Sequence, residues 1–342
     1  MKGIAPAQNP DFSNILRLIA AARHHAARAV NVALVELYWQ VGQTISEKLA
    51  KAEWGEGVVD QLAAHIAQTQ PGLRGFARPN LYRMRQFYET YCDQPIVSTL
   101  LRQLSWSHNL AILGQCKRPE ERQFYIEMST REKWPFRELE RQIKGALFER
   151  SVLQPANVSA VLRQLHPGAE SLFRDAYLVE FLSLPQGHDE RGLHLGLLAR
   201  LKNFLLELGR DFTFAGSQYP VQVGGRDFAI DLLFFHRGLN CLVAFELKVG
   251  RFEPEYLGKL SFYLEALDRD ERKPHEAPAI GVLLCASKDD EVVEYALSRT
   301  LSPALIAEYQ TKLPDKKLLQ AKLHEFWLLN RGDSAPADGD AL

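Results

Sequence analysis

The sequence predicts a multidomain protein, with an all-α N-terminal domain, for which a winged-helix-like form is one candidate, and an α/β C-terminal domain. Three observations support this prediction. The chain has 342 residues, which is enough for two domains that each bury a core. Up to about residue 150, apolar residues recur with helical spacing and strand signals are few. Beyond that point short apolar runs alternate with helical stretches, which is typical of an α/β core.

The N-terminal domain is expected over residues 12–150. Its helices are indicated by apolar residues that recur on one face, at 15–22, 30–41, 58–66, 79–88 and 137–150. Pro79 suits the first turn of its helix, and Ser105 or Ser107 suits the N-cap of a further helix. The adjacent Ser107 and His108 are better explained by capping than by catalysis, because no nucleophile elbow accompanies them.

The C-terminal domain is expected over residues 168–330, after a linker at 151–167 that contains two prolines. Its predicted helices lie at 176–182, 189–208, 254–267, 290–298 and 315–329. Its predicted strands lie at 212–223, 228–235, 241–248, 279–285 and 305–309. Residues 331–342 are expected to form a disordered tail.

Charged residues interrupt two of the predicted buried strands. The first of these strands contains Asp231, and the second contains Glu246 and Lys248. If His236 pairs with Cys241 across a four-residue loop, Asp231 lies directly opposite Glu246. Side chains alternate along a strand, so Lys248 shares the face of Glu246. The three charged groups are therefore expected to meet on one patch.

Such a patch needs a physical reason, because unpaired buried charges are costly. Two adjacent carboxylates repel each other unless a cation or a proton lies between them. Oxygen ligands with room for water suit Mg²⁺ or Mn²⁺. The structural alternative is a buried salt-bridge cluster, but two acids and one base would leave it with a net negative charge.

Net charge gives only a weak indication of nucleic-acid binding. The chain carries a net charge of −1, although residues 1–150 hold 20 basic and 15 acidic side chains and the remainder holds 21 and 27. Basic and aromatic residues are interleaved near residue 80, at Arg78, Tyr82, Arg83, Arg85, Phe87 and Tyr88. This mixture suits phosphate contacts and base stacking, or equally an amphipathic helix that buries its aromatic side chains.

The composition favours a cytoplasmic protein without membrane contact. No apolar run approaches the roughly 20 residues that a membrane span requires. Residues 1–6 lack the hydrophobic core of a signal peptide. The four cysteines are scattered without CxxC spacing, which favours buried free thiols over disulfides or a zinc site.

Asp231, followed fifteen residues later by Glu-Leu-Lys, resembles the PD-(D/E)XK nuclease signature. A longer set of segments is similar to the YhcG-type family of bacterial proteins. In the C-terminal half these segments are FLLELG at 204–209, DLLFFH at 231–236, ELKVG at 246–250, PEY at 254–256 and IGVLLC at 280–285. In the N-terminal half they are YWQVG at 38–42, MRQFY at 84–88, LSWSH at 104–108 and REL at 137–139.

This resemblance covers nearly the whole chain and implies a restriction-endonuclease-like C-terminal domain joined to a helical domain that is a candidate for DNA binding. A protein partner, or a second copy of the chain, is the other candidate contact of the N-terminal domain. It implies that Asp231 and Glu246 ligate Mg²⁺ or Mn²⁺, with the carbonyl of Leu247 as a further ligand. Lys248 would position or activate the attacking water.

Further site residues follow from the same resemblance. Lys259 and Tyr263 look like the Gln-x-x-x-Tyr pair of some nucleases of this superfamily, with Lys in place of Gln. Gln218 lies where relatives carry an Arg-Gln pair. His194 occupies a position where many members have an acidic residue, although Glu190 is one helical turn away. The candidate nucleic-acid contacts are Gln218, Lys259 and Tyr263, together with Arg78, Arg83 and Arg85 of the basic and aromatic stretch near residue 80.

The leading hypothesis is a divalent-metal-dependent nuclease that hydrolyses DNA phosphodiester bonds in DNA repair, recombination or defence. The alternative, motivated by His194, is a catalytically silent nuclease fold that binds DNA or recruits a partner.

Overall fold

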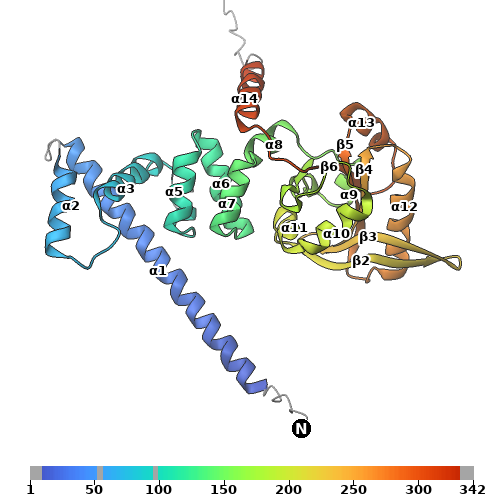
Figure 1. Ribbon diagram of the computed structural model, residues 1–342, viewed down its shortest axis with the longest axis horizontal. Helices are drawn as coiled ribbons and strands as arrows, with labels where there is room; N and C mark the ends of the chain where they lie inside the picture. Colours follow the sequence, from blue (N-terminus) through green and yellow to red (C-terminus); the bar gives the residue numbers. More distant parts are fainter. Residues whose placement is uncertain (1–9, 52–56, 95–98, 332–342) are drawn as a thin grey trace, which may run out of the picture. The chain divides into compact units, whose positions relative to one another are not determined.

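The computed structural model describes residues 10–51, 57–94 and 99–331. The chain divides into two compact units, residues 1–140 and 141–342 (Figure 1). The last described residue, Arg331, ends a helix, and the rest of the expected disordered tail lies outside the described residues. None of the helices in the described ranges combines the length and the apolarity that a bilayer crossing requires.

Unit 1 is helical, as predicted. Its helices are α1 (Pro10–Ala50), α2 (Val58–Thr69), α3 (Arg78–Tyr91), α5 (Trp106–Gln115), α6 (Pro119–Glu132) and the first part of α7 (Phe136–Lys144). The two amphipathic stretches predicted before residue 50 belong to one long helix, α1. No β-strand occurs among the described residues of this unit, so the wing of a winged helix is not found there. Ser105 caps α5, and its hydroxyl also lies 2.6 Å from His108 Nδ1.

A glycine sets the spacing between α1 and α3. A Cβ added at Gly42 would overlap the backbone carbonyl of Met84, so the two helices touch at this point. Around the contact, large side chains from both helices are buried, namely Val35, Tyr38, Ile45, Leu81, Met84 and Phe87. The core of unit 1 therefore depends on a position that only glycine fits.

Gly42→Ala is expected to destabilise the protein by about 1–3 kcal/mol, because the methyl group would force α1 and α3 apart. The matched control is Gly114→Ala in α5, where an added Cβ meets no atom within 4 Å. That substitution is expected to be neutral or to stabilise by up to about 1 kcal/mol through helix propensity. Urea unfolding of the two variants checks the difference, and equal effects would contradict the packing argument.

Unit 2 is built on a six-stranded sheet with the order β1-β6-β5-β4-β3-β2. The strands are β1 (Ala176–Leu178), β2 (Phe212–Val223), β3 (Arg226–His236), β4 (Cys241–Arg251), β5 (Ala277–Ser287) and β6 (Ala304–Gln310). Strands β2, β3 and β4 pair antiparallel, whereas β4, β5, β6 and β1 pair parallel.

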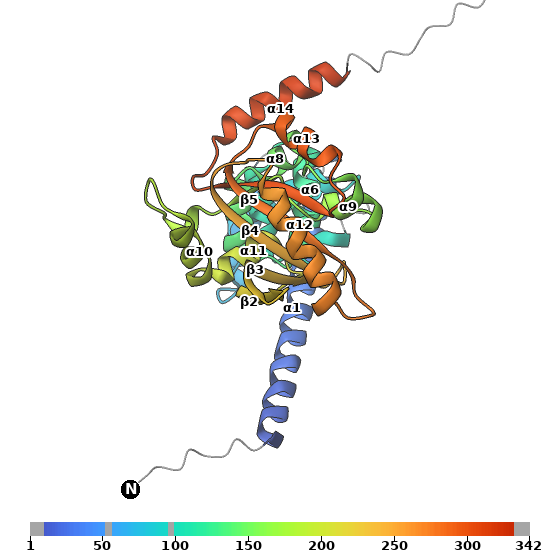
Figure 2. The same cartoon turned by 90° about the vertical axis from the view of Figure 1, so that its right-hand side faces the viewer.

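Helices cover both faces of this sheet (Figures 1 and 2). One face packs against α9 (Ala160–Leu165), α10 (Glu190–Ala199) and α11 (Leu201–Leu208). The other packs against α12 (Tyr256–Ala266) and α13 (Asp290–Ser298). The remaining helices of the unit are α8 (Leu147–Leu153) and α14 (Lys316–Arg331). Strands buried on both faces explain why β4 and β5 are almost continuously apolar in sequence.

Four expected elements were wrong in detail. The segment 176–182 is not a helix, because Ala176–Leu178 pairs with β6 as a buried strand and a 3₁₀ turn follows it. The helix expected at 189–208 is interrupted at Arg200. The one expected at 137–150 is broken by Ala146, which has a φ of 51°. The expected linker is folded: Ser159 is buried, and its hydroxyl caps α9 and donates to the Ser302 carbonyl.

A buried carboxylate ties several segments of unit 2 together. Glu207 on α11 accepts hydrogen bonds from Arg174 (2.7 Å) and the Leu178 amide (3.0 Å). It also accepts hydrogen bonds from Arg141 (2.8 Å) and Gln142 (3.0 Å). Burial alone would raise the pKa of Glu207, but the arginines outweigh it and lower this pKa to about 2. Glu207 is therefore ionised at neutral pH.

Candidate active site

The β3–β4 hairpin has the predicted register. His236 pairs with Cys241, and the ladder continues to the pair Leu232 and Phe245. Asn240 ends the connecting loop with a φ of 52°, as its residue type allows. The next pair in this register would be Asp231 with Glu246, and the backbone ladder stops there.

Where the backbone ladder ends, the Asp231 side chain forms hydrogen bonds to both neighbouring strands. Its Oδ2 accepts a hydrogen bond from the Leu247 amide at 2.9 Å. Its Oδ1 accepts one from the side-chain amide of Gln218 at 3.0 Å. His194 Nε2 lies 3.2 Å from the Asp231 carbonyl oxygen. The carboxylate is thus held in place from both neighbouring strands, β4 and β2.

Gln218 reaches Asp231 from an irregular part of β2. The β2–β3 register shifts between Phe214 and Gly216, and Gln218 has a φ of 44°. A left-handed conformation costs about 1–3 kcal/mol for a residue that is not glycine, and such strain clusters at functional sites. The sequence indicated Gln218 as a candidate nucleic-acid contact but not its hydrogen bond to Asp231, because no local sequence pattern predicts the irregularity in β2.

Glu246 is the buried acid of the site, with a residue exposure of 1%. Its Oε1 lies 2.6 Å from Lys259 Nζ and 3.1 Å from Lys248 Nζ. Its Oε2 is buried without a hydrogen-bond partner among the described residues. Burial and then repulsion from Asp231 raise the pKa of Glu246 above its usual 4.5, although the two lysines oppose this.

Both lysines are held as ammonium ions. Burial works to lower the pKa of Lys248, but Glu246 and Glu190 outweigh it, so this pKa is raised. Burial also works to lower the pKa of Lys259, but the hydrogen bond to Glu246 outweighs it, so this pKa is raised as well. Lys248 Nζ also lies 5.5 Å from the centre of the Tyr256 ring. The patch therefore combines two carboxylates with two ammonium groups.

Helix α10 adds an acidic residue to this patch. Glu190 lies 3.2 Å from Lys248 Nζ and is on the same helix face as His194, four residues later. Position 194 carries a histidine in place of an acidic residue, but Glu190 supplies an acidic side chain one helical turn earlier. Its side chain is 53% exposed, so it borders the solvent side of the site.

The remaining predicted nucleic-acid contacts differ in their burial and in their partners. Tyr263 is buried and its hydroxyl donates to the Ala229 carbonyl at 2.8 Å, so it packs against the sheet. On α3, Arg78 pairs with Asp60, and Arg85 pairs with Glu89 at 2.7 Å. Arg83 is exposed on that helix. The structure groups Asp231, Glu246, Lys248, Lys259 and Gln218, whereas the α3 arginines belong to unit 1.

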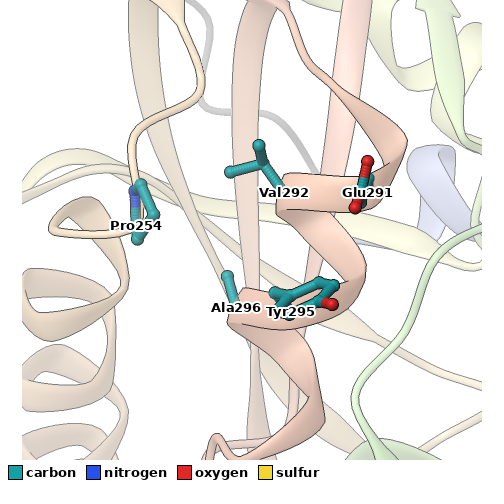
Figure 3. Close-up of a pocket in the computed structure, with 5 residues that line it drawn as sticks. All are labelled: Pro254, Glu291, Val292, Tyr295 and Ala296. Carbon is teal, nitrogen blue, oxygen red and sulfur yellow. The ribbon is translucent and has the colours of Figure 1, made fainter.

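A separate hollow lies beside α13 and contains none of the residues of the patch. Pro254, Glu291, Val292, Tyr295 and Ala296 line it, and its volume is about 460 Å³ (Figure 3). The first turn of α13 is acidic, with Asp290 and Glu291. Phosphate groups would be repelled there, so this hollow is a poor place for a nucleic-acid backbone.

The class of protein follows from this fold and patch, together with matches to two families. A mixed sheet between helices, with an aspartate and an E-x-K strand converging where the pairing of two central strands ends, defines the PD-(D/E)XK nuclease fold. The family described as "YhcG PDDEXK nuclease domain" matches residues 170–324, and the "DUF1016 N-terminal domain" matches residues 14–150.

The chain belongs to the YhcG family. It is 31% identical to the Escherichia coli (strain K12) protein named "Putative nuclease YhcG", over 90% of this chain and 92% of that protein. A crystal structure of a repair endonuclease from Pyrococcus abyssi is also similar, with a TM-score of 0.25 and 14% identity. That similarity covers 38% of this chain and 50% of the other, and it carries no argument about this chain.

Proposed function

We propose that the protein is a divalent-metal-dependent endonuclease that hydrolyses DNA phosphodiester bonds. One observation carries the proposal: Asp231 and Glu246 meet beside Lys248, and one oxygen of Glu246 is buried without a partner among the described residues. A buried acceptor left unsatisfied is costly, so a group that binds it is expected. A cation also relieves the repulsion between the two acids.

The donor set fits a hard cation that keeps several waters. In the described ranges, no three His, Cys, Asp or Glu side chains are grouped to hold a metal. Asp231 and Glu246 would therefore supply two ligands, with the Leu247 carbonyl as a third and water completing the shell. This arrangement suits Mg²⁺ or Mn²⁺. Such an ion supplies an activated water and neutralises charge that develops on the phosphate.

Lys248 is proposed to act through its charge. Because its pKa is raised by Glu246 and Glu190, it stays protonated at neutral pH and is a poor general base. An ammonium group here stabilises negative charge on the scissile phosphate and orients the attacking water. Lys259 and Gln218 would hold Glu246 and Asp231 in place and face the substrate from the same side.

A cleavage screen tests the proposal. Duplex, branched and single-stranded DNA and matched RNA substrates are incubated with the protein and Mg²⁺ or Mn²⁺, with EDTA as the control. Cleavage of at least one DNA substrate that EDTA abolishes is expected. DNA binding without cleavage across the panel would reject the nuclease proposal.

Metal affinity is expected to depend on pH through Glu246. The carboxylate must be ionised to bind a cation, and its pKa is raised above 4.5. As the pH is lowered, Mn²⁺ affinity should therefore begin to fall at a higher pH than it would at a site with an ordinary glutamate. Below the pKa of Glu246, the affinity should fall by up to about tenfold per pH unit. Calorimetric titrations from neutral pH down to 4.5 measure this, and a constant affinity over that range would contradict it.

The second candidate is a silent nuclease fold that binds DNA or recruits a partner. His194 motivated it, but Glu190 provides an acidic side chain next to Lys248, which favours the active enzyme. DNA repair, recombination and defence are the processes that such an enzyme would serve.

In unit 1, the exposed Arg83 is the best placed of the α3 arginines for phosphate contacts, because acidic residues already pair with Arg78 and Arg85.

A further inference from the structure

The first half of α1 carries apolar side chains that no described residue of unit 1 covers. Leu18, Ile19, Val30 and Leu37 are 60%, 49%, 67% and 42% exposed. Figure 1 shows this part of the helix extending beyond α2, α3 and α5. Long helices in proteins are stabilised mainly by packing of an apolar face, so a partner for this one is expected.

These side chains form a continuous stripe. At 3.6 residues per turn, eight of the eleven exposed apolar positions described between residues 18 and 37 fall within an arc of about 120°, while Ala20, Ala21 and Val32 lie outside it. The eight are Leu18, Ile19, Ala22, Ala26, Ala29, Val30, Ala33 and Leu37. Val35, Tyr38 and Ile45, which pack into unit 1, lie on a different side of the helix. We call this exposed arc the α1 stripe.

The α1 stripe runs directly into an apolar groove. Leu37 is the last residue of the stripe and also lines a hollow of about 370 Å³. The other lining residues come from α1, α2 and the loop after α2, and they include Val41, Leu62, Ile66 and Phe76. A ridge and a groove thus lie end to end on one surface. Two copies related by a twofold axis would place the ridge of each in the groove of the other.

The distribution of charge along α1 indicates what binds the α1 stripe and the groove, and in which direction it runs. Residues 12–35 contain three arginines, two histidines and no acidic residue, whereas residues 36–50 contain two glutamates and one lysine. Antiparallel pairing brings the basic half of one helix against the half of its partner that holds the glutamates, of which Glu36 already pairs with Arg102 and Glu47 is exposed. Parallel pairing would oppose the two basic halves, and a nucleic acid bound to the arginines would leave the apolar stripe in water.

We infer that the protein forms a homodimer in which two α1 helices pair antiparallel, each stripe seated in the groove of the other copy. About 30 Å of helix per copy takes part, which is enough to reach the roughly 1,000 Å² of a specific interface. The inference is independent of the proposed nuclease activity, because mass and cross-linking are measured without substrate.

Sedimentation of the full-length protein over a concentration series tests the inference. Wild type is expected at twice the chain mass, and Ile19→Glu with Val30→Glu is expected to raise the dimer dissociation constant at least about 100-fold. The matched control is Leu301→Glu with Leu313→Glu, which changes exposed leucines of unit 2 (89% and 46%) and should stay dimeric. A monomeric wild type, or equal behaviour of the two variants, would overturn the inference.

Cysteine cross-linking tests the direction of pairing. In a Cys92→Ser background, which removes the exposed native thiol, Ala33→Cys lies near the proposed twofold axis and should form a disulfide dimer under oxidation. Leu18→Cys should not, because antiparallel pairing about residue 33 separates the two copies of residue 18 by about 45 Å. Efficient cross-linking of both variants would indicate parallel helices and would reject the arrangement.

Discussion

Asp231→Asn is expected to reduce DNA cleavage by about 10³-fold or more. The substitution keeps the size of the side chain and an oxygen that can accept the Leu247 amide, but it removes the charge that would bind the cation. Loss of metal-based stabilisation of the transition state costs several kcal/mol, and each ~1.4 kcal/mol is tenfold in rate. Initial cleavage rates with Mg²⁺ at neutral pH measure the effect.

The matched control for this variant is Asp227→Asn. Asp227 lies on the same strand, is exposed and accepts a hydrogen bond from Gln222 instead of contacting the site. Its substitution should leave the cleavage rate within about twofold, since surface changes away from the site have small effects. Comparable losses in both variants would mean that Asp231 has no special role.

Glu207→Ala is expected to destabilise the protein by about 3–5 kcal/mol, because it removes the fully buried carboxylate that the half-buried Arg141 and Arg174 share. That loss is a large fraction of the stability of a typical domain. Urea unfolding measures it. Glu294→Ala, at an exposed position on α13, serves as the control and should change stability by less than about 0.5 kcal/mol.

The same residue predicts a pH dependence of stability. The pKa of Glu207 is about 2 in the folded protein, below its ordinary value of 4.5, so the folded state favours the ionised form. Its stabilising contribution is fully present above pH 4.5 and is lost as the pH falls from 4.5 towards 2. Glu207→Gln should flatten this part of the stability profile, and an unchanged profile would contradict the ion-pair network.

Much of the candidate site could be predicted because local patterns carried it. The apolar strands and the loop ending at Asn240 predict a hairpin, and strand alternation then brings Asp231, Glu246 and Lys248 together. The pairing of His236 with Cys241 confirms the predicted register of the hairpin. The family resemblance added Lys259, whose hydrogen bond to Glu246 no periodicity could indicate.

What the sequence did not predict depends on contacts between distant segments. β1 is only three residues long and is a strand because β6 pairs with it, so its apolar run was indistinguishable from a helix. Glu207 accepts hydrogen bonds from a side chain of α7, from Arg174 just before β1 and from the Leu178 amide at the end of β1, which no local pattern links. The folded segment at 151–167 is held through Ser159 and residues near 302, about 145 positions later.

Calorimetric titration of Mn²⁺ at neutral pH, on wild type and on Asp231→Asn, tests most directly whether the two acids hold a cation. Wild type is expected to bind one ion per chain, and the variant is expected to lose at least about tenfold in affinity, or 1.4 kcal/mol. Equal binding by the two proteins would contradict the assignment of Asp231 and Glu246 as the metal site.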